Sequence, residues 1–280
     1  MESTRRAPLP VMIVTYLVLA AFVIVALFPF YWMALTSIRT PRGVFVREKM
    51  LIPQEFTLEN YKFIFTERET AAWLKNSTVV ALATSSLSVI IGVLAGYALV
   101  RLRFRGNRTV AKTILFTYLL PSSLLFIPMF ILMYSLDLID SHLGLILAYQ
   151  SFNVPFCTWL ILGYFRSIPE ELEDAALIDG CSRLSVLFRI VLPLAAPGII
   201  TAFIFGFTNS WNEFLYASTL MQARKMMTLP IGLGSYVQGD VFLWGPLMAS
   251  ALITTIPPII LFMFVQRYVV SGMTLGSVKG

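Results

Sequence analysis

Long stretches without charge alternate with shorter polar segments along the chain. Six runs contain no Asp, Glu, Lys or Arg, and each is longer than the roughly 20 residues that a helix needs to cross the hydrocarbon core of a bilayer. The pattern predicts an all-α integral membrane protein with six transmembrane helices. Their expected ranges are about 11–36, 77–100, 113–135, 143–165, 190–214 and 245–267.

Composition supports a membrane protein over a soluble one. Of the 280 residues, 58% are hydrophobic and only 13% are charged, whereas soluble domains carry about 25% charged residues. The chain contains neither a phosphate-binding loop nor a dinucleotide fingerprint. We therefore expect one membrane domain over residues 1–280 with no catalytic residue, metal or cofactor. Cys157 and Cys181 are expected to be inert packing residues.

The distribution of Lys and Arg predicts the orientation of the chain. The segment 101–112 carries five positive charges and no negative one, and loops of this kind stay in the cytoplasm. With six spans, both termini and the segment 167–189 then lie on the same side. The net charge of +6 is thereby explained by topology and does not point to nucleic acid.

No Asp, Glu, Lys or Arg lies in the middle of any of the six predicted spans. A charge there costs about 2.5–3.5 kcal/mol on insertion scales, and transporters driven by protons or ions retain one for function. The nearest acid, Glu213, lies at the end of the fifth run. This favours a transporter whose energy comes from another subunit, with a secondary transporter or channel working alone as the alternative.

The segment 167–189 differs from the other loops because it combines acids with alanines. Residues 169–180 are predicted to form a helix on the inner surface, with Leu172, Ala175, Ala176 and Asp179 on one face. Gly180 can adopt positive φ and end that helix. A small-residue face rimmed by carboxylates suits insertion into a basic groove of a cytoplasmic protein. A helix resting on lipid fits less well, because anionic headgroups repel carboxylates.

The same segment carries a recognisable motif. Asp174-Ala-Ala, then Gly180 after three intervening residues, and Ile190-x-Leu192-Pro193 after nine more resemble the EAA motif of permease subunits of bacterial binding-protein-dependent ABC importers. Asp174 stands where that family usually has Glu, which leaves open whether Asp174 or Glu173 makes the main contact. The segment Trp211-Asn-Glu-Phe, the segment 228–233 and the end 271–280 resemble the carbohydrate branch, of the maltose-permease type.

The resemblance implies half of a translocation path in a bacterial inner membrane. It implies a second permease subunit, often a different chain, two ATPase subunits that use the ATP, and an extracytoplasmic solute-binding protein. The cargo would be a sugar or sugar derivative, with glycerol phosphate or peptide as alternatives. The residues expected at the ATPase interface are Glu170, Glu173, Asp174, Ala175, Ala176, Asp179, Gly180, Leu192 and Pro193.

Three further sets of residues are expected to meet partners or cargo. Within the tail 268–280, Val278, Lys279 and Gly280 would contact the ATPases. The outer loop of about 216–240 is rich in Met, Gly and polar residues and is expected to be flexible; Pro230, Gly232, Gly234 and Tyr236 would face the binding protein. Hydrogen-bonding and aromatic side chains for the substrate path are Tyr149, Asn153, Asn209, Trp211 and Asn212.

Overall fold

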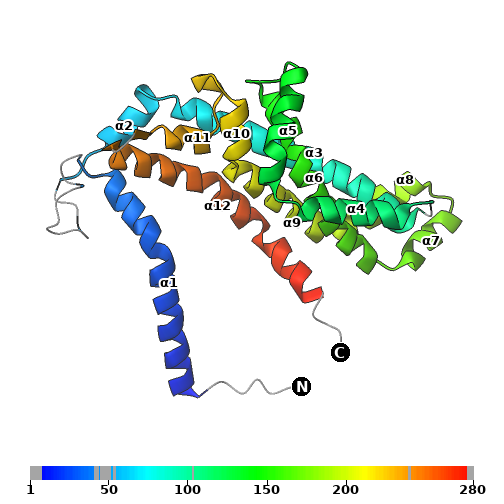
Figure 1. The fold of residues 1–280 in the computed structure, drawn as a ribbon. Coiled ribbons are helices and arrows are strands. Elements are labelled where there is room, and N and C mark those ends of the chain that lie inside the picture. Colours follow the sequence, from blue (N-terminus) through cyan, green and yellow to red (C-terminus); the bar gives the residue numbers. More distant parts are fainter. Residues whose placement is uncertain are drawn as a thin grey trace. The chain divides into compact units, whose positions relative to one another are not determined.

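The structure, a computed structural model, describes residues 8–40, 44, 52, 55–102, 104–238 and 241–275. Its contacts group the chain into two units, Met1–Arg68 with Tyr236–Ile253, and Glu69–Ser235 with Thr254–Gly280. In chain order the elements (Figure 1) are α1 (Leu9–Ser37), α2 (Glu59–Thr66), α3 (Thr70–Arg101), α4 (Asn107–Leu119), α5 (Ser122–Ser135), α6 (His142–Ser167), α7 (Glu170–Ile178), α8 (Arg183–Val186), the π-helical η1 (Leu187–Val191), α9 (Leu192–Asn212), α10 (Leu215–Leu220), the 3-10 turn η2 (Arg224–Met226), α11 (Leu229–Gly234), β1 (Val237–Gln238), β2 (Val241–Phe242) and α12 (Trp244–Leu275).

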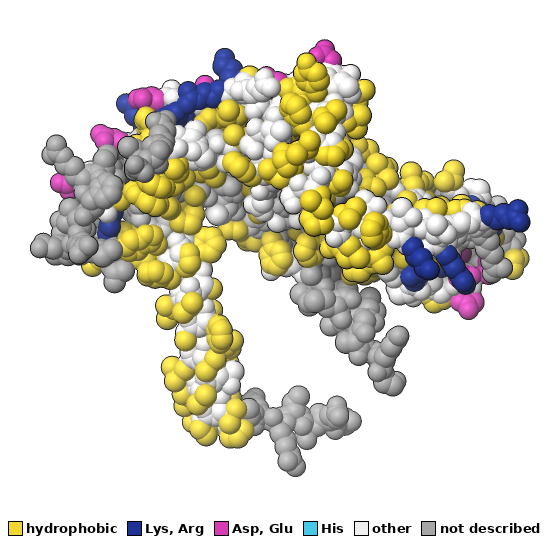
Figure 2. Space-filling view, viewed as in Figure 1, with side chains coloured by type: hydrophobic (Ala, Val, Ile, Leu, Met, Phe, Trp, Pro, Cys, Tyr) yellow, Lys and Arg dark blue, Asp and Glu magenta, His cyan; other side chains and the backbone are white. Residues whose placement is uncertain are grey.

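In the first unit, α1 is apolar on all sides. Side chains from Leu9 to Tyr31 are almost all exposed, and Figure 2 shows hydrophobic side chains along the length of the helix. A helix that is hydrophobic all round requires an apolar surrounding. Within its own unit the described residues leave this surface uncovered, which is typical of a helix that lies in a membrane.

The end of α1 is fixed by a side chain from α2. The amide of Asn60 donates to the carbonyl oxygens of Ser37 at 2.8 Å and Arg39 at 2.9 Å. These bonds satisfy carbonyls that a helix end leaves without an intrahelical partner. A short antiparallel ladder also lies in this unit, pairing Val237 with Phe242 and Gln238 with Val241.

The second unit is built around three long helices, α3, α6 and α9, which lie against one another (Figure 1). Glycines make the close approach possible: a Cβ on Gly92 would lie 3.1 Å from the backbone of Thr158, and one on Gly206 would lie 3.5 Å from the Sγ atom of Cys157. Small residues at helix contacts are typical of membrane bundles, where packing replaces the hydrophobic effect.

The contacts also give the directions of these helices. Along α3, Gly92 lies against Thr158 and Gly96 lies against Phe165, so α3 and α6 run parallel. Tyr164 of α6 lies against Gly198, and Cys157 lies against Gly206, so α9 runs antiparallel to them. Parallel neighbours in a membrane require the chain to return to its starting side between them.

That return is made by a broken helix. We expect a transmembrane helix over about 113–135; in the structure this stretch is divided into α4 and α5, which meet at an angle of 99°. Pro121 has no N–H to donate and its ring disfavours a helical conformation for the residue before it; Leu120 is accordingly extended, with ψ 132°. Among the described residues, five helices are long and apolar enough to cross a membrane, and there are six if the bent pair counts as one span. The all-α, multi-span fold expected from the sequence is confirmed.

Candidate functional site

The acidic segment forms a short helix, α7, and the neighbouring residues determine where it begins and ends. Pro169 precedes it, and its first turn carries three glutamates, where the helix dipole favours negative charge. Gly180 has φ +87°, as expected from the sequence. The N–H groups of Gly180 and Cys181 donate to the carbonyls of Leu177 at 3.1 Å and Ala176 at 3.0 Å. This pattern is a Schellman ending.

One face of α7 is held against the bundle by a buried ion pair. Arg101, the last residue of α3, donates through Nε to Glu173 Oε1 at 2.5 Å, and the hydroxyl of Tyr97 donates to Glu173 Oε2 at 3.1 Å. A second arginine nitrogen, Nη2, donates to the carbonyls of Phe165 at 3.2 Å and Ile168 at 2.8 Å. The bonds join α3, the end of α6 and α7 in one polar contact, which we call the Arg101 clamp.

The Arg101 clamp is costly to break because both of its charged side chains are buried. The side chains of Arg101 and Glu173 are 7% and 6% exposed. Removing one partner of a buried pair leaves an uncompensated charge, at a cost of about 3–5 kcal/mol. Glu170 lies 3.5 Å from the same guanidinium, but its side chain is 62% exposed, so water screens that contact. The clamp therefore holds α7 rigidly to α3.

The opposite face of α7 is free in this chain. Glu171, Asp174, Ala175 and Ile178 are exposed, and Ile178 is 87% exposed. Their spacing of i, i+3, i+4 and i+7 places them on one side of a helix. We call these four residues the free face of α7: two carboxylates, a small residue and an isoleucine that has no cover in the described chain.

The free face differs from the one expected from the sequence. We expected Leu172, Ala175, Ala176 and Asp179 to lie together on an open surface. Ala176 is instead only 9% exposed and belongs to the buried cluster that includes Val186. The reason is that the Arg101 clamp turns Glu173 inward, and Ala176, one turn later, follows it. Asp174 is the exposed member of the Glu173–Asp174 pair.

The Leu-Pro pair of the motif lies where the segment after α7 enters the long helix α9. Residues Leu187–Val191 form a π-helical turn, and the N–H of Leu192 donates to the carbonyl of Leu187. Pro193 follows directly, and a proline ring clashes with the carbonyl four residues earlier. The wider π turn accommodates that ring without ending the helix. Leu192 and Pro193 thereby shape the connection rather than the free face of α7.

The residues expected along a substrate path divide into buried and exposed sets. Tyr149 and Asn153 are fully buried and Trp211 is 1% exposed. The hydroxyl of Tyr149 donates to Glu213 at 2.7 Å and the amide of Asn153 donates to the hydroxyl of Ser210 at 2.9 Å. These bonds hold helices together.

Asn209 and Asn212, in contrast, are exposed near the end of α9. Together with Phe205, which is 51% exposed, and the half-buried Thr208, they place polar groups on one side of an otherwise apolar helix. A polar stripe on a transmembrane helix is costly against lipid, which indicates that this side faces another subunit or an aqueous path.

The loop expected to be flexible is largely folded. The indole N–H of Trp73 donates to the carbonyl of Arg224 at 2.8 Å, and the amide of Asn76 donates to the carbonyls of Lys225 at 2.8 Å and Met227 at 2.9 Å. Because α3 satisfies the backbone of this segment, the segment has a defined conformation that the sequence did not reveal.

The four residues expected to face a binding protein are therefore unequal. Gly232 is buried against the indole of Trp73, which a Cβ at this position would clash with, and Tyr236 is fully buried. Gly234 is exposed and Pro230 is half-buried. Of this set, only Gly234 and part of Pro230 present a surface.

Two further expectations concern the tail and metals. Val278, Lys279 and Gly280 lie outside the described residues. Within the described part of the chain, no group of three or more His, Cys, Asp or Glu side chains is placed to hold a metal ion.

Sequence reasoning missed the partner that orients α7. The charge pattern places Arg101 only in the positively charged segment 101–112, and it predicts no role for Tyr97. The available signal was an arginine at the end of a charge-free run next to a carboxylate-rich helix, since a charge at a membrane boundary near opposite charges tends to pair. The sequence alone did not say which carboxylate it would choose.

The comparisons with known proteins agree with this architecture. Residues 88–275 match the family described as "Binding-protein-dependent transport system inner membrane component". The chain is 36% identical over 95% of its length to the inner membrane ABC transporter permease protein YcjP of Escherichia coli, of which the match covers 95%. It is 38% identical over 91% of its length to the sulfoquinovosyl glycerol transport system permease protein SmoH of Agrobacterium fabrum, covering 89% of that protein.

A solved structure shares the fold. The chain is similar, with a TM-score of 0.79 and 25% identity, to a chain in the crystal structure of a bacterial ABC transporter involved in the import of the acidic polysaccharide alginate; the match covers 96% of this chain and 99% of that one. The family match, the identity to full-length permeases and the shared fold lead to one conclusion. The chain belongs to the binding-protein-dependent inner-membrane permeases, the transmembrane subunits of ABC importers, and has no ATPase site of its own.

Proposed function

We propose that the protein forms half of the path by which a sugar or sugar derivative is imported, and that the free face of α7 receives the motion of a cytoplasmic ATPase. The observation that carries this is the Arg101 clamp. A helix locked to the bundle by a buried ion pair transmits force to it, whereas a loosely attached one would dissipate it. The clamp leaves Asp174, Ala175 and Ile178 open for a partner.

The proposed assembly contains a second permease subunit, two ATPase subunits and an extracytoplasmic binding protein. In this proposal both termini and α7 lie on the cytoplasmic side, since Arg101 and Arg108 of the positively charged segment 101–112 line one cavity with Glu170 of α7 and cytoplasmic loops are enriched in Lys and Arg. ATP binding closes the ATPases, α7 moves with them, and the two permeases alternate between facing inward and outward. Chemistry resides in the ATPases, so this chain supplies no catalytic group.

The docking role is tested by substitutions on the free face. Ala175→Arg and Ile178→Asp are expected to reduce co-purification of the ATPase at least tenfold, because a basic groove rejects arginine and an apolar socket rejects a carboxylate. Lys225→Ala, on the exposed turn η2, is the matched control and should retain the ATPase. Unchanged co-purification in both variants would remove the free face from the interface.

The cargo is proposed from the resemblance to sugar permeases and from the relative named for sulfoquinovosyl glycerol transport. The exposed polar stripe of α9 fits it, because Asn209 and Asn212 can donate to and accept from hydroxyls while Phe205 offers a ring face for a sugar. The test is ATP-dependent uptake of labelled glycosides, glycerol phosphate and a peptide into vesicles that hold the full transporter. Uptake of glycerol phosphate or peptide in preference to every glycoside contradicts a sugar cargo, and uptake without ATP hydrolysis contradicts the importer mechanism.

Asn209→Leu and Asn212→Leu sharpen the cargo proposal. Both side chains are exposed, so their loss leaves the bundle intact, and each should raise the half-saturating sugar concentration or lower the transport rate several-fold. Ser218→Ala, an exposed position on the nearby α10, is the control. If the two asparagine variants transport normally, this stripe contacts the neighbouring subunit instead of the cargo.

A further inference from the structure

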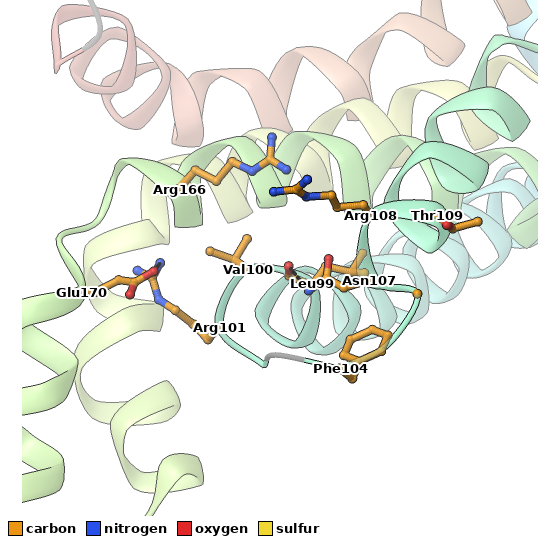
Figure 3. A pocket seen from close by; sticks show the side chains of 10 residues that line it. Leu99, Val100, Arg101, Phe104, Asn107, Arg108, Thr109, Arg166 and Glu170 are labelled. Atoms are coloured by element: carbon orange, nitrogen blue, oxygen red, sulfur yellow. Dashed lines mark hydrogen bonds and ion pairs between the residues drawn. The ribbon is translucent and has the colours of Figure 1, made fainter.

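A cavity opens where α3, α4 and α6 end beside α7. Its volume is about 670 Å³, and its lining residues are Leu99, Val100, Arg101, Phe104, Gly106, Asn107, Arg108, Thr109, Arg166 and Glu170. Three arginines thus meet at one hollow. Figure 3 shows Arg101 reaching toward Glu170, while Arg108 from α4 and Arg166 from α6 point toward one another.

The charge in this cavity is unbalanced. Arg101 is occupied by the Arg101 clamp, and Glu170, the single acid in the lining, lies 3.5 Å from that same arginine. Arg108 and Arg166 are exposed and take part in none of the ion pairs found in the described residues. Two guanidinium groups that face each other repel unless an anion lies between them. The pair therefore offers a site for a bidentate oxyanion.

An apolar groove continues from the same cavity. It has a volume of about 380 Å³ and shares Leu99, Asn107, Arg108 and Arg166 with the cavity. Lys112 adds a third cation at its edge. The remaining lining is mostly apolar and comprises Ala111, Ile114, Leu115, Thr158, Trp159 and Leu162. The cationic cavity thereby opens directly into the apolar groove between α4 and α6.

The apolar groove favours a lipid over a free anion as the ligand of this site. A free phosphate ion would use the two arginines but has no use for an apolar groove. An ATPase carboxylate would likewise not fill a groove that runs toward the membrane-spanning part of α6. Trp159 is 46% exposed and stacks on Tyr118, with 5.8 Å between the ring centroids. Trp and Tyr side chains are enriched at the level of lipid headgroups.

We propose that this site binds an anionic glycerophospholipid. Its phosphodiester lies between Arg108 and Arg166, with Lys112 nearby, and one acyl chain lies in the groove between α4 and α6. Basic pockets between transmembrane helices are suited to lipid headgroups of this charge. Since Arg101 also lines the cavity, the lipid would rest against the residue that holds α7. The proposal requires only that the chain spans a membrane and is independent of the cargo.

The test is native mass spectrometry of the full-length chain purified from nanodiscs that contain equal parts of phosphatidylglycerol and phosphatidylcholine. The wild-type chain should retain one phosphatidylglycerol in preference to phosphatidylcholine. Arg108→Gln and Arg166→Gln should each lower that occupancy roughly fivefold, in line with the contribution of one cation near an anionic lipid surface. Leu115→Gln, in the groove, should lower retention while the arginines stay in place.

Arg189→Gln is the matched control, because Arg189 is an exposed arginine outside both linings. An equal loss in this variant shows general charge attraction and overturns the site. Equal retention of phosphatidylcholine also overturns it. Displacement of the lipid by millimolar inorganic phosphate would show an adventitious anion site and contradict the proposal for the groove. None of these results bears on the proposed cargo or on the proposed ATPase interface.

Discussion

The two ends of the α3–α6–α9 bundle both use a carboxylate that accepts a hydrogen bond from a tyrosine, but they complete it differently. At the α7 end, Glu173 accepts from Tyr97 and from the cation of Arg101. At the other end, Glu213 accepts from Tyr149 at 2.7 Å and from the backbone N–H groups that begin α10.

The difference shows what each end is built to do. An ion pair with a buried arginine joins three separate elements and is strong only when both partners are present. A carboxylate on the first N–H groups of a helix is a local cap, typically worth about 1 kcal/mol. The α7 end is thus a junction that fixes α7 to two long helices, as the proposed transmission of motion requires, whereas the Glu213 end positions the short helix α10.

The largest effect is expected from neighbouring alanines on the two sides of α7. Ala176→Arg places a charged side chain in the buried cluster around Val186, and burial of an unpaired charge is among the few single changes that cost more than about 4 kcal/mol. Ala175→Arg lies on the free face and should stay within about 0.5 kcal/mol. The thermal midpoint and the monodisperse fraction in detergent measure both. Equal tolerance of the two variants would mean that α7 is not held in this orientation.

A matched substitution at the two carboxylates probes the comparison directly. Glu173→Gln leaves Arg101 buried without its main counter-charge, and the free energy of unfolding should fall by about 3–5 kcal/mol; the partial pairing with Glu170 keeps the loss from exceeding this range. Glu213→Gln retains an oxygen acceptor for Tyr149 and one N–H, so the loss should be about 1 kcal/mol. Denaturation of both variants by SDS titration gives the difference. Similar losses at both positions would contradict the distinction between junction and cap.

The membrane spans could be predicted from the sequence because one strong energy term determines them. Charges are excluded from the hydrocarbon core, so charge-free runs mark the helices α1, α3, α6, α9 and α12. The break between α4 and α5 was harder to predict, because prolines occur within other helices here, including α6 and α9. Whether a proline bends or breaks a helix depends on what satisfies the freed carbonyl, which is a tertiary property.

The orientation of α7 could not be predicted for a related reason. Helical periodicity gives the residues that share a face but not which face is buried. Arg101, 72 positions away in sequence from Glu173, decides that, and it moves Ala176 from the expected surface into the core. Likewise Tyr149 and Asn153 have the side chains of a sugar site but form bonds within the bundle.

The tyrosines offer a subtler comparison of the two ends. Tyr97→Phe and Tyr149→Phe each remove one hydrogen bond to a carboxylate that keeps its other donors. Both should lower the free energy of unfolding by about 1.5 kcal/mol, the lower range for hydrogen bonds to charged groups. Tyr16→Phe, on the exposed α1, should be neutral. A loss at Tyr97 as large as that of Glu173→Gln would place the strength of the junction in the tyrosine and not in Arg101.

The smallest effects are expected at Gly180, which follows α7, and at Gly163, which lies in α6. Both have room for a Cβ, but their backbone conformations differ. A Cβ at Gly180 or at Gly163 meets no atom within 4 Å, but Gly180 has φ +87° whereas Gly163 lies within α6. Gly180→Ala should therefore cost about 1 kcal/mol through left-handed backbone strain alone, and Gly163→Ala should stabilise by about 0.5 kcal/mol because it lowers the entropy of the unfolded chain. Opposite shifts of the thermal midpoint are the expected signature. If Gly180→Ala stabilised as Gly163→Ala does, the turn after α7 would not be held in the left-handed conformation, and α7 would have an end free to extend toward α8.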